Sequence, residues 1–175
     1  AGADAYNVAV GHQAGLLVST GIYNTLVGAR CGDALTTGNY NIAIGMDALT
    51  TEDTGNRNVA MGYGALYNLN YDGDAYNTAV GHSAGSQMTT GTSNTLIGGL
   101  AGDALTDGNA NVAVGRGALS GETRGDRNVA IGYEALLAQN NTSDVDAYNV
   151  AVGYAAGTAV TTGTQNTLIG GLAGD

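Results

Sequence analysis

The chain has 175 residues with no Pro, Phe, Trp or Lys, 30 Gly, and 15 acidic residues against 5 basic ones, which gives a net charge of −10. This acidity argues against nucleic acid and anionic membranes as partners, and no run of about 20 apolar residues is present to insert into a bilayer. The opening AGADAY also lacks the charged and apolar regions of a signal peptide.

One five-residue word recurs from the beginning of the chain to its end: Asn, then Val, Thr or Ile, then Ala or Leu, then Val, Ile or Met, then Gly. Its ten copies lie 17 residues apart, except for one spacing of 19 and one of 21. This period, with β-branched residues, Gly and Asn but no heptads, predicts an all-β, parallel β-solenoid of ten coils, each with a short strand after its Asn. The Asn side chains are predicted to form a ladder along the axis: Asn7, Asn24, Asn41, Asn58, Asn77, Asn94, Asn111, Asn128, Asn149 and Asn166.

A longer period of four coils overlies the first. Eight residues after the Asn, the copies read Gly, Gly, Leu, Leu, and this order repeats along the chain. The groups begin near residues 4, 74 and 146, each with the phrase DAYN, so we interpret 1–175 as a single repeat array. The last copy stops about halfway through a coil, and we expect the chain to be a fragment of a longer fibre. Coils with Gly at the eighth position usually carry an apolar residue three positions later, which predicts two ways of filling the interior: Val18, Leu35, Met88, Leu105 and Val160.

The word also predicts which side chains face the interior. The first and third residues after the Asn, such as Val8 and Val10, share one face of a strand, and the second, such as Ala9, faces the other way. We expect the large pair to point into the coil and the Ala or Leu to form an outer stripe. A continuous stripe of this kind predicts an interface and favours a homotrimer, with a filament, another oligomer or a monomer as alternatives.

Single residues with reactive side chains do not form a pattern typical of catalysis, so we expect neither an enzyme nor a bound cofactor. His12 and His82 occupy equivalent positions without a second metal ligand at fixed spacing, which favours an exposed corner. Cys31 stands in a column of Ala residues and is interpreted as a small buried thiol. Arg57 and Arg127 each precede an Asn and are expected to pair with acidic groups in the next coil.

Two insertions lengthen the fourth coil of a group, at residues 67–77 and 136–149. Extra residues in a solenoid protrude at a corner, where ligand binding is often placed. The first insertion offers a surface for stacking a sugar, with a plain surface loop as the alternative: Tyr67, Asn68, Asn70, Tyr71, Asp72 and Tyr76.

Acidic and amide side chains in the insertions suggest two further chemistries. The calcium candidates are Asp72, Asp74, Asp144 and Asp146, although the Glu that would close a calcium loop is replaced by Ala79. Asn140 and Asn141 lie in overlapping N-glycosylation sequons.

The phrases NVAVGHQAG, NIAIGMDAL, NVAIGYEAL and NTLIGGLAGD resemble the head repeats of trimeric autotransporter adhesins (YadA-like heads), whose motif is close to N-S-V-A-I-G-x-x-A. They are equally similar to repeat regions of phage tail fibres, and the resemblance covers the whole chain. It implies a left-handed, trimeric β-roll, outside the cell or on a virion, that acts in adhesion to a cell-surface glycan or protein. The coils here are longer than those of adhesin heads. We therefore expect a structural or adhesive fibre module; the alternatives are a calcium- or glycan-binding solenoid and a self-assembling extracellular filament subunit.

Overall fold

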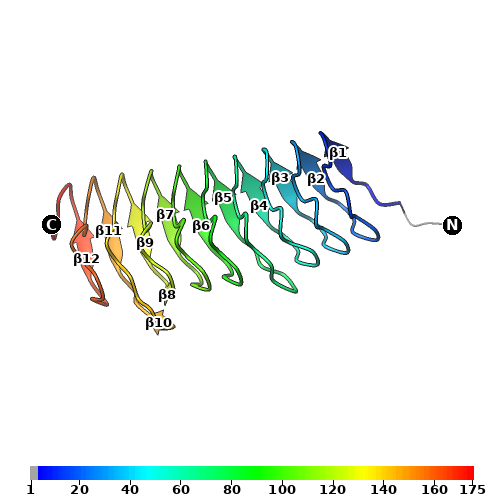
Figure 1. Ribbon diagram of the computed structural model, residues 1–175. Helices are drawn as coiled ribbons and strands as arrows, with labels where there is room; N and C mark the ends of the chain where they lie inside the picture. Colours follow the sequence, from blue (N-terminus) through cyan, green and yellow to red (C-terminus); the bar gives the residue numbers. More distant parts are fainter. Residues whose placement is uncertain (1–3) are drawn as a thin grey trace.

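The computed structural model describes residues 4–175, which wind into a parallel β-solenoid (Figure 1). The predicted all-β solenoid is confirmed: ten short strands stack into one sheet in the order β1-β2-β3-β4-β5-β6-β7-β9-β11-β12, and β8 pairs with β10 in a separate two-stranded sheet. We number the coils 1 to 10 from the ten repeated Asn residues. Among residues 4–175 there is no helix that could cross a membrane. The strands are β1 (Val8–Val10), β2 (Thr25–Val27), β3 (Ile42–Ile44), β4 (Val59–Met61), β5 (Thr78–Val80), β6 (Thr95–Ile97), β7 (Val112–Val114), β8 (Gly125–Asp126), β9 (Val129–Ile131), β10 (Val145–Asp146), β11 (Val150–Val152) and β12 (Thr167–Ile169).

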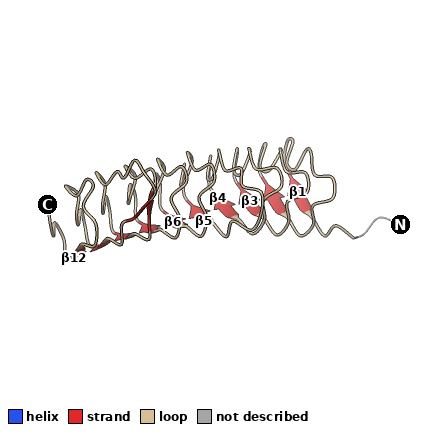
Figure 2. Cartoon of the chain, turned by 90° about the horizontal axis from the view of Figure 1, so that it is seen from below, coloured by secondary structure: helices blue, strands red, loops and turns tan. Residues whose placement is uncertain are grey.

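Equivalent positions of the repeated word lie opposite one another in every strand pair of the main sheet. Ala79 pairs with Leu96, for example, and Ala130 with Ala151 across the longer insertion. The strands therefore run along one side of the rod and the turns along the others (Figure 2). The insertions do not shift the register of the main sheet, so their extra residues are taken up on the other sides of the coil. There the pairing is offset by one residue, as between Asp126 and Asp146.

The ten Asn side chains connect successive coils. The backbone N–H of Asn24 donates to Oδ1 of Asn7 at 2.8 Å, and Nδ2 of Asn24 donates to the carbonyl oxygen of Gly38 in the following coil at 2.8 Å. The Asn residues of coils 2 to 9 are buried. Each amide thereby satisfies backbone groups that the narrow interior hides from water.

The expected orientation of the strand side chains is wrong. Ile97 is 40% exposed and Val10 is 58% exposed, whereas Leu96, between Thr95 and Ile97, is fully buried. Side chains alternate along a strand, so the residue two positions after an inward Asn also points inward. From the second coil on, the Ala or Leu of the word fills the interior, and the larger pair, β-branched except for Met61, faces out.

The four-coil period follows from how single Leu side chains fill this interior. A Cβ on Gly85 or on Gly102 would lie 2.8 Å from a methyl carbon of Leu96, so this one Leu takes the space of two side chains. Where a strand has Ala and the strand of the next coil also has Ala, as at Ala43, the residue eight after the Asn is a buried Leu (Leu49). The two predicted ways of filling the interior are confirmed: Leu35, Met88 and Leu105 are fully buried, and Val18 and Val160 pack against the same core.

Close contact between backbones explains the Gly that ends every word. Gly98 has φ 135°, and a Cβ there would lie 2.5 Å from the carbonyl oxygen of Gly115 in the next coil. No side chain fits at this approach, and the conformation itself favours Gly.

The inward and outward positions of β6 can be tested by two substitutions. We expect Leu96→Ala to lower the free energy of unfolding by about 2–5 kcal/mol, because it leaves a cavity next to two glycines. Ile97→Thr is the control and should cost much less in dilute solution, since Thr already faces outward in four strands. Urea unfolding followed by circular dichroism measures both; a larger loss for Ile97→Thr would contradict the assignment of faces.

Candidate functional site

The outward side chains of the ten strands form a continuous surface that we call the sheet face. It carries no charged residue, although the chain has a net charge of −10. Scattered exposed apolar residues are ordinary, but an array that spans ten coils is typical of an interface. The Ala and Leu column, on which we expected an interface, lies inside the coil, so the exposed apolar stripe of the chain is the sheet face instead. Its two rows are Val8, Thr25, Ile42, Val59, Thr78, Thr95, Val112, Val129, Val150 and Thr167, and Val10, Val27, Ile44, Met61, Val80, Ile97, Val114, Ile131, Val152 and Ile169.

A column of stacked side chains lies just before the strands of coils 1 to 5. The rings of Tyr6 and Tyr23 stack at 5.3 Å between centroids, and those of Tyr23 and Tyr40 at 5.1 Å. The guanidinium of Arg57 continues the column, 4.9 Å from the Tyr40 ring and 5.6 Å from the Tyr76 ring. The ring faces are occupied by one another, so this column stiffens the corner and offers few free faces for stacking a ligand.

The predicted ion pairs of the two arginines are present. Nε of Arg57 lies 2.9 Å from Asp74, and Arg127 pairs with Asp146, in each case one coil further on. Both acidic residues also accept a hydrogen bond from the tyrosine two positions later.

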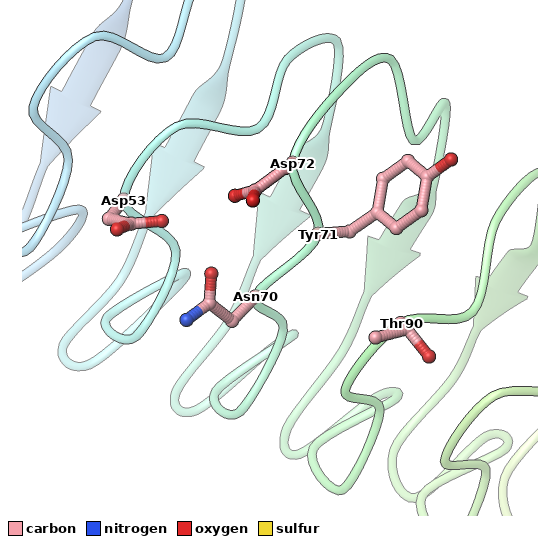
Figure 3. Close-up of a pocket in the computed structure, with 5 residues that line it drawn as sticks. All are labelled: Asp53, Asn70, Tyr71, Asp72 and Thr90. Carbon is pink, nitrogen blue, oxygen red and sulfur yellow. The ribbon is translucent and has the colours of Figure 1, made fainter.

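The six residues predicted to stack a sugar do not form one surface. Asn70, Tyr71 and Asp72 line an open cavity of about 440 Å³ together with Asp53 and Thr90 (Figure 3). Tyr67, Asn68 and Tyr76 do not line it: Tyr76 belongs to the stacked column, and Nδ2 of Asn68 donates to Gln87 at 3.4 Å. The ring of Tyr71 projects away from Asp53, Asn70 and Asp72 in Figure 3 and packs partly against the core. The cavity is therefore built mainly from hydrogen-bonding groups.

Two buried glutamates, which the sequence analysis did not single out, fasten the insertions. Glu52 and Glu122 stand 11 residues after an Asn, where most other coils place Leu, Met or Val, and both are fully buried. The Glu52 carboxylate accepts the N–H groups of Gly55 at 2.7 Å and of Tyr71, in the first insertion, at 3.1 Å. A signal was present in the sequence: this apolar column is interrupted by Glu 70 residues apart, each time in the coil before an insertion.

Glu122 holds the second insertion through a larger buried network. It accepts the backbone N–H of Asn141 at 2.9 Å, the Asn141 side-chain amide at 3.0 Å, and the Gln139 amide at 2.9 Å. Gln139 in turn accepts from the ladder residue Asn149 at 3.0 Å. The insertion is thus anchored to the interior and to the Asn ladder.

The four calcium candidates either have other hydrogen-bond or ion-pair partners or are exposed. Asp74 and Asp146 are already paired with arginines, Asp144 is exposed, and Asp72 accepts the Thr54 hydroxyl at 2.6 Å. In the part of the chain that the structure describes, no three His, Cys, Asp or Glu side chains gather to hold a metal ion.

Of the two sequon residues, Asn140 is exposed, whereas Asn141 is only 5% exposed and bonded to Glu122. The Asn141 amide is therefore not accessible in the folded chain, and glycosylation of either residue stays a prediction.

The histidines and the cysteine lie where they were predicted. His12 and His82 are exposed, and the His82 ring stacks on Tyr63 at 5.2 Å. Cys31 is fully buried, its Sγ lies 3.2 Å from the carbonyl oxygen of Gly28, and burial raises the pKa of its thiol. A buried thiol with a raised pKa is a poor nucleophile.

No protein-family model, curated protein or solved structure matches this chain. Proposals about its function therefore rest on the sheet face, the stacked column and the cavity at the first insertion.

The buried Glu52 predicts a pH dependence of stability. Burial raises the pKa of its carboxyl, and backbone hydrogen bonds from Tyr71 and Gly55 lower it only in part. The folded chain therefore holds this proton more tightly than the unfolded chain, whose pKa is near 4.5. The stabilising contribution is complete below that value and is lost as the pH rises through the higher folded pKa.

We expect the native chain to lose stability relative to Glu52→Gln as the pH rises from about 4 to about 8, because the Glu52 carboxyl gives up its proton over this range and Gln exchanges none. Urea unfolding across this range measures it. Gln87→Asn, at an exposed position, is the control: it neither adds nor removes a titratable group, so its difference in stability from the native chain should stay constant with pH. Parallel curves for the native chain and Glu52→Gln would refute the prediction.

Proposed function

We propose that this chain is a structural module of an adhesive fibre, extracellular, on a cell surface or on a virion, in which solenoids pack side by side through their sheet faces. The observation that carries the proposal is the uncharged, β-branched sheet face that spans all ten coils. Copies with a net charge of −10 repel one another in general, but this face allows close approach, because the charged residues lie outside its two rows.

Stiffness suits the chain to such a role. Hydrogen bonds join every coil to the next through the Asn ladder and through backbone groups on the other sides of the coil. Ten coils at about 4.8 Å each give a rod of roughly 48 Å. The stacked tyrosines and Arg57 brace one corner of this rod against bending.

A homotrimer is the assembly that we favour, since three equivalent faces can close around one axis and bury the apolar rows completely. A filament of laterally packed rods uses the same face. The proposal assigns no catalytic reaction and no cofactor to the chain, and it places attachment to a cell-surface glycan or protein at the coil corners.

A calcium-dependent solenoid is the weaker alternative. Arg57 and Arg127 already neutralise Asp74 and Asp146, and a guanidinium beside a carboxylate opposes the binding of a second cation.

The assembly is tested by placing a charge on the sheet face. We expect the native chain to have a mass in solution that is a multiple of 17.3 kDa by light scattering, and Ile97→Lys to reduce it toward 17.3 kDa. Burying a Lys against the apolar rows of a partner is costly unless it finds an opposite charge.

Gln87→Lys adds the same charge at an exposed position outside the sheet face and should leave the mass of the assembly unchanged. A native chain that stays at 17.3 kDa at high concentration would overturn the proposal. An Ile97→Lys variant that assembles as well as the native chain would overturn the role of the sheet face.

A further inference from the structure

The cavity at the first insertion lies where a series of backbone hydrogen bonds is interrupted. Twelve residues after the Asn, the N–H of one coil donates to the carbonyl of the next, as from Thr36 to Asp53 and from Asn70 to Thr89. Among the described residues the series breaks between Asp53 and Asn70, and again between Thr123 and Asn140. Both breaks fall between a coil with a buried glutamate and the inserted coil that follows it.

The two breaks are closed differently. At the second, the Thr123 hydroxyl lies 2.9 Å from Oδ1 of Asn140 and 3.0 Å from the carbonyl oxygen of Asn141, so it bridges the two coils. At the first, Asp53 takes the place of Thr123, and a carboxylate has no hydrogen to donate. Oδ1 of Asp53 is buried and has no hydrogen-bond partner. That oxygen is covered by the chain itself, but the Asp53 side chain as a whole is half-buried and lines an open volume of about 440 Å³ at this break.

The groups around this volume point to the class of ligand. In Figure 3 the Asp72 carboxylate and the Asn70 amide both turn toward Asp53, and Thr90 lines the cavity from the next coil. Carboxylates accept hydrogen bonds, whereas an amide and a hydroxyl both accept and donate. Hydroxyl groups of a sugar also donate and accept, so a polyol can donate to the carboxylates that line the cavity and pair with the Asn70 amide and the Thr90 hydroxyl.

Size and charge favour a sugar over an ion. The volume of about 440 Å³ lies in the range of small-molecule sites, about 300–1,000 Å³, and exceeds what a bare cation fills. Calcium takes six to eight oxygen ligands at close range. Asp72, however, already accepts the Thr54 hydroxyl, and no third acidic side chain joins the described cluster.

We infer that the cavity formed by Asp53, Asn70, Tyr71, Asp72 and Thr90 binds one pyranose unit of a glycan through hydrogen bonds to its hydroxyl groups. The inference deepens the proposed adhesive function and rests on it only for its biological meaning, because the cavity lies within one chain. The second insertion, with Thr123 in place of Asp53, is an internal counterpart in which the bridging hydroxyl replaces the ligand.

The most informative substitution at the cavity copies the residue that stands at the equivalent position of the second break. Asp53→Thr recreates the second break, and Thr occupies the same position in several other coils, so the variant should fold. Asp53→Asn keeps the size of the side chain, removes its charge and replaces one acceptor oxygen by a donating NH2 group. Asp103→Asn is the matched control, because Oδ1 of Asp103 is also buried without a partner but lies outside the cavity.

Binding is measured by nuclear magnetic resonance titration with methyl glycosides of mannose, galactose and glucose, each alone. We expect at least one to produce saturable shifts at the Asn70 side-chain amide and the Thr90 backbone amide. Affinity should fall by at least about tenfold in Asp53→Thr and Asp53→Asn, as for the loss of hydrogen bonds to a charged group, and stay unchanged in Asp103→Asn.

Three results would overturn the inference: no saturable shift with any of the three glycosides, equal affinity in Asp53→Thr, or the same shifts from calcium chloride with loss of the sugar response in EDTA. The last result would make the cavity a cation site. Ile97→Lys should bind the sugar as the native chain does, so failure of the sugar site and failure of sheet-face assembly are told apart.

Discussion

The structure depends on a buried amide that repeats once per coil. Each ladder Asn accepts the backbone N–H of the next Asn through Oδ1, and most donate through Nδ2 to a glycine carbonyl of the next coil. These backbone groups are buried in a narrow solenoid, so an inward amide satisfies them within the chain. The ladder loses its glycine acceptor at the insertions: Nδ2 of Asn58 donates instead to the carbonyl of Asn56, and Nδ2 of Asn128 to Asn111. The amide network thus adapts at the two places where the coil is lengthened.

An inward Asn has two consequences for the rest of the coil. The alternation of side chains along a strand turns the Ala or Leu inward and the β-branched pair outward, which makes the interior small and the outer face apolar. A small interior in turn needs Gly wherever backbones approach or a Leu crosses between coils, as Leu96 does beside Gly85 and Gly102. The same amide therefore links the glycine content, the four-coil period and the sheet face.

The insertions show how a regular solenoid acquires a local feature. A buried glutamate, Glu52 or Glu122, replaces an apolar side chain and accepts backbone N–H groups of its own coil and of the insertion. The insertion is anchored without a change in the register of the main sheet. The two copies differ in length and at several positions, among them Asp53 against Thr123. The Asp53 side chain lines the cavity at the first insertion. The proposed ligand site therefore lies at a place where the two internal copies differ.

The repeat itself was readable from the sequence: its period, its parallel strands, their register, the two ways of filling the interior, the buried Cys31 and the ion pairs of Arg57 and Arg127. These features depend on residue spacing alone, because positions that recur at one period stack in a solenoid. The direction of the strand faces was predicted wrongly, since alternation permits either face to be inward until the side of the Asn is known. The cavity and the roles of Glu52 and Asp53 were decided only by the tertiary structure. They arise from contacts between neighbouring coils at a lengthened corner, where the distance along the chain no longer predicts which groups meet and which are left without a partner.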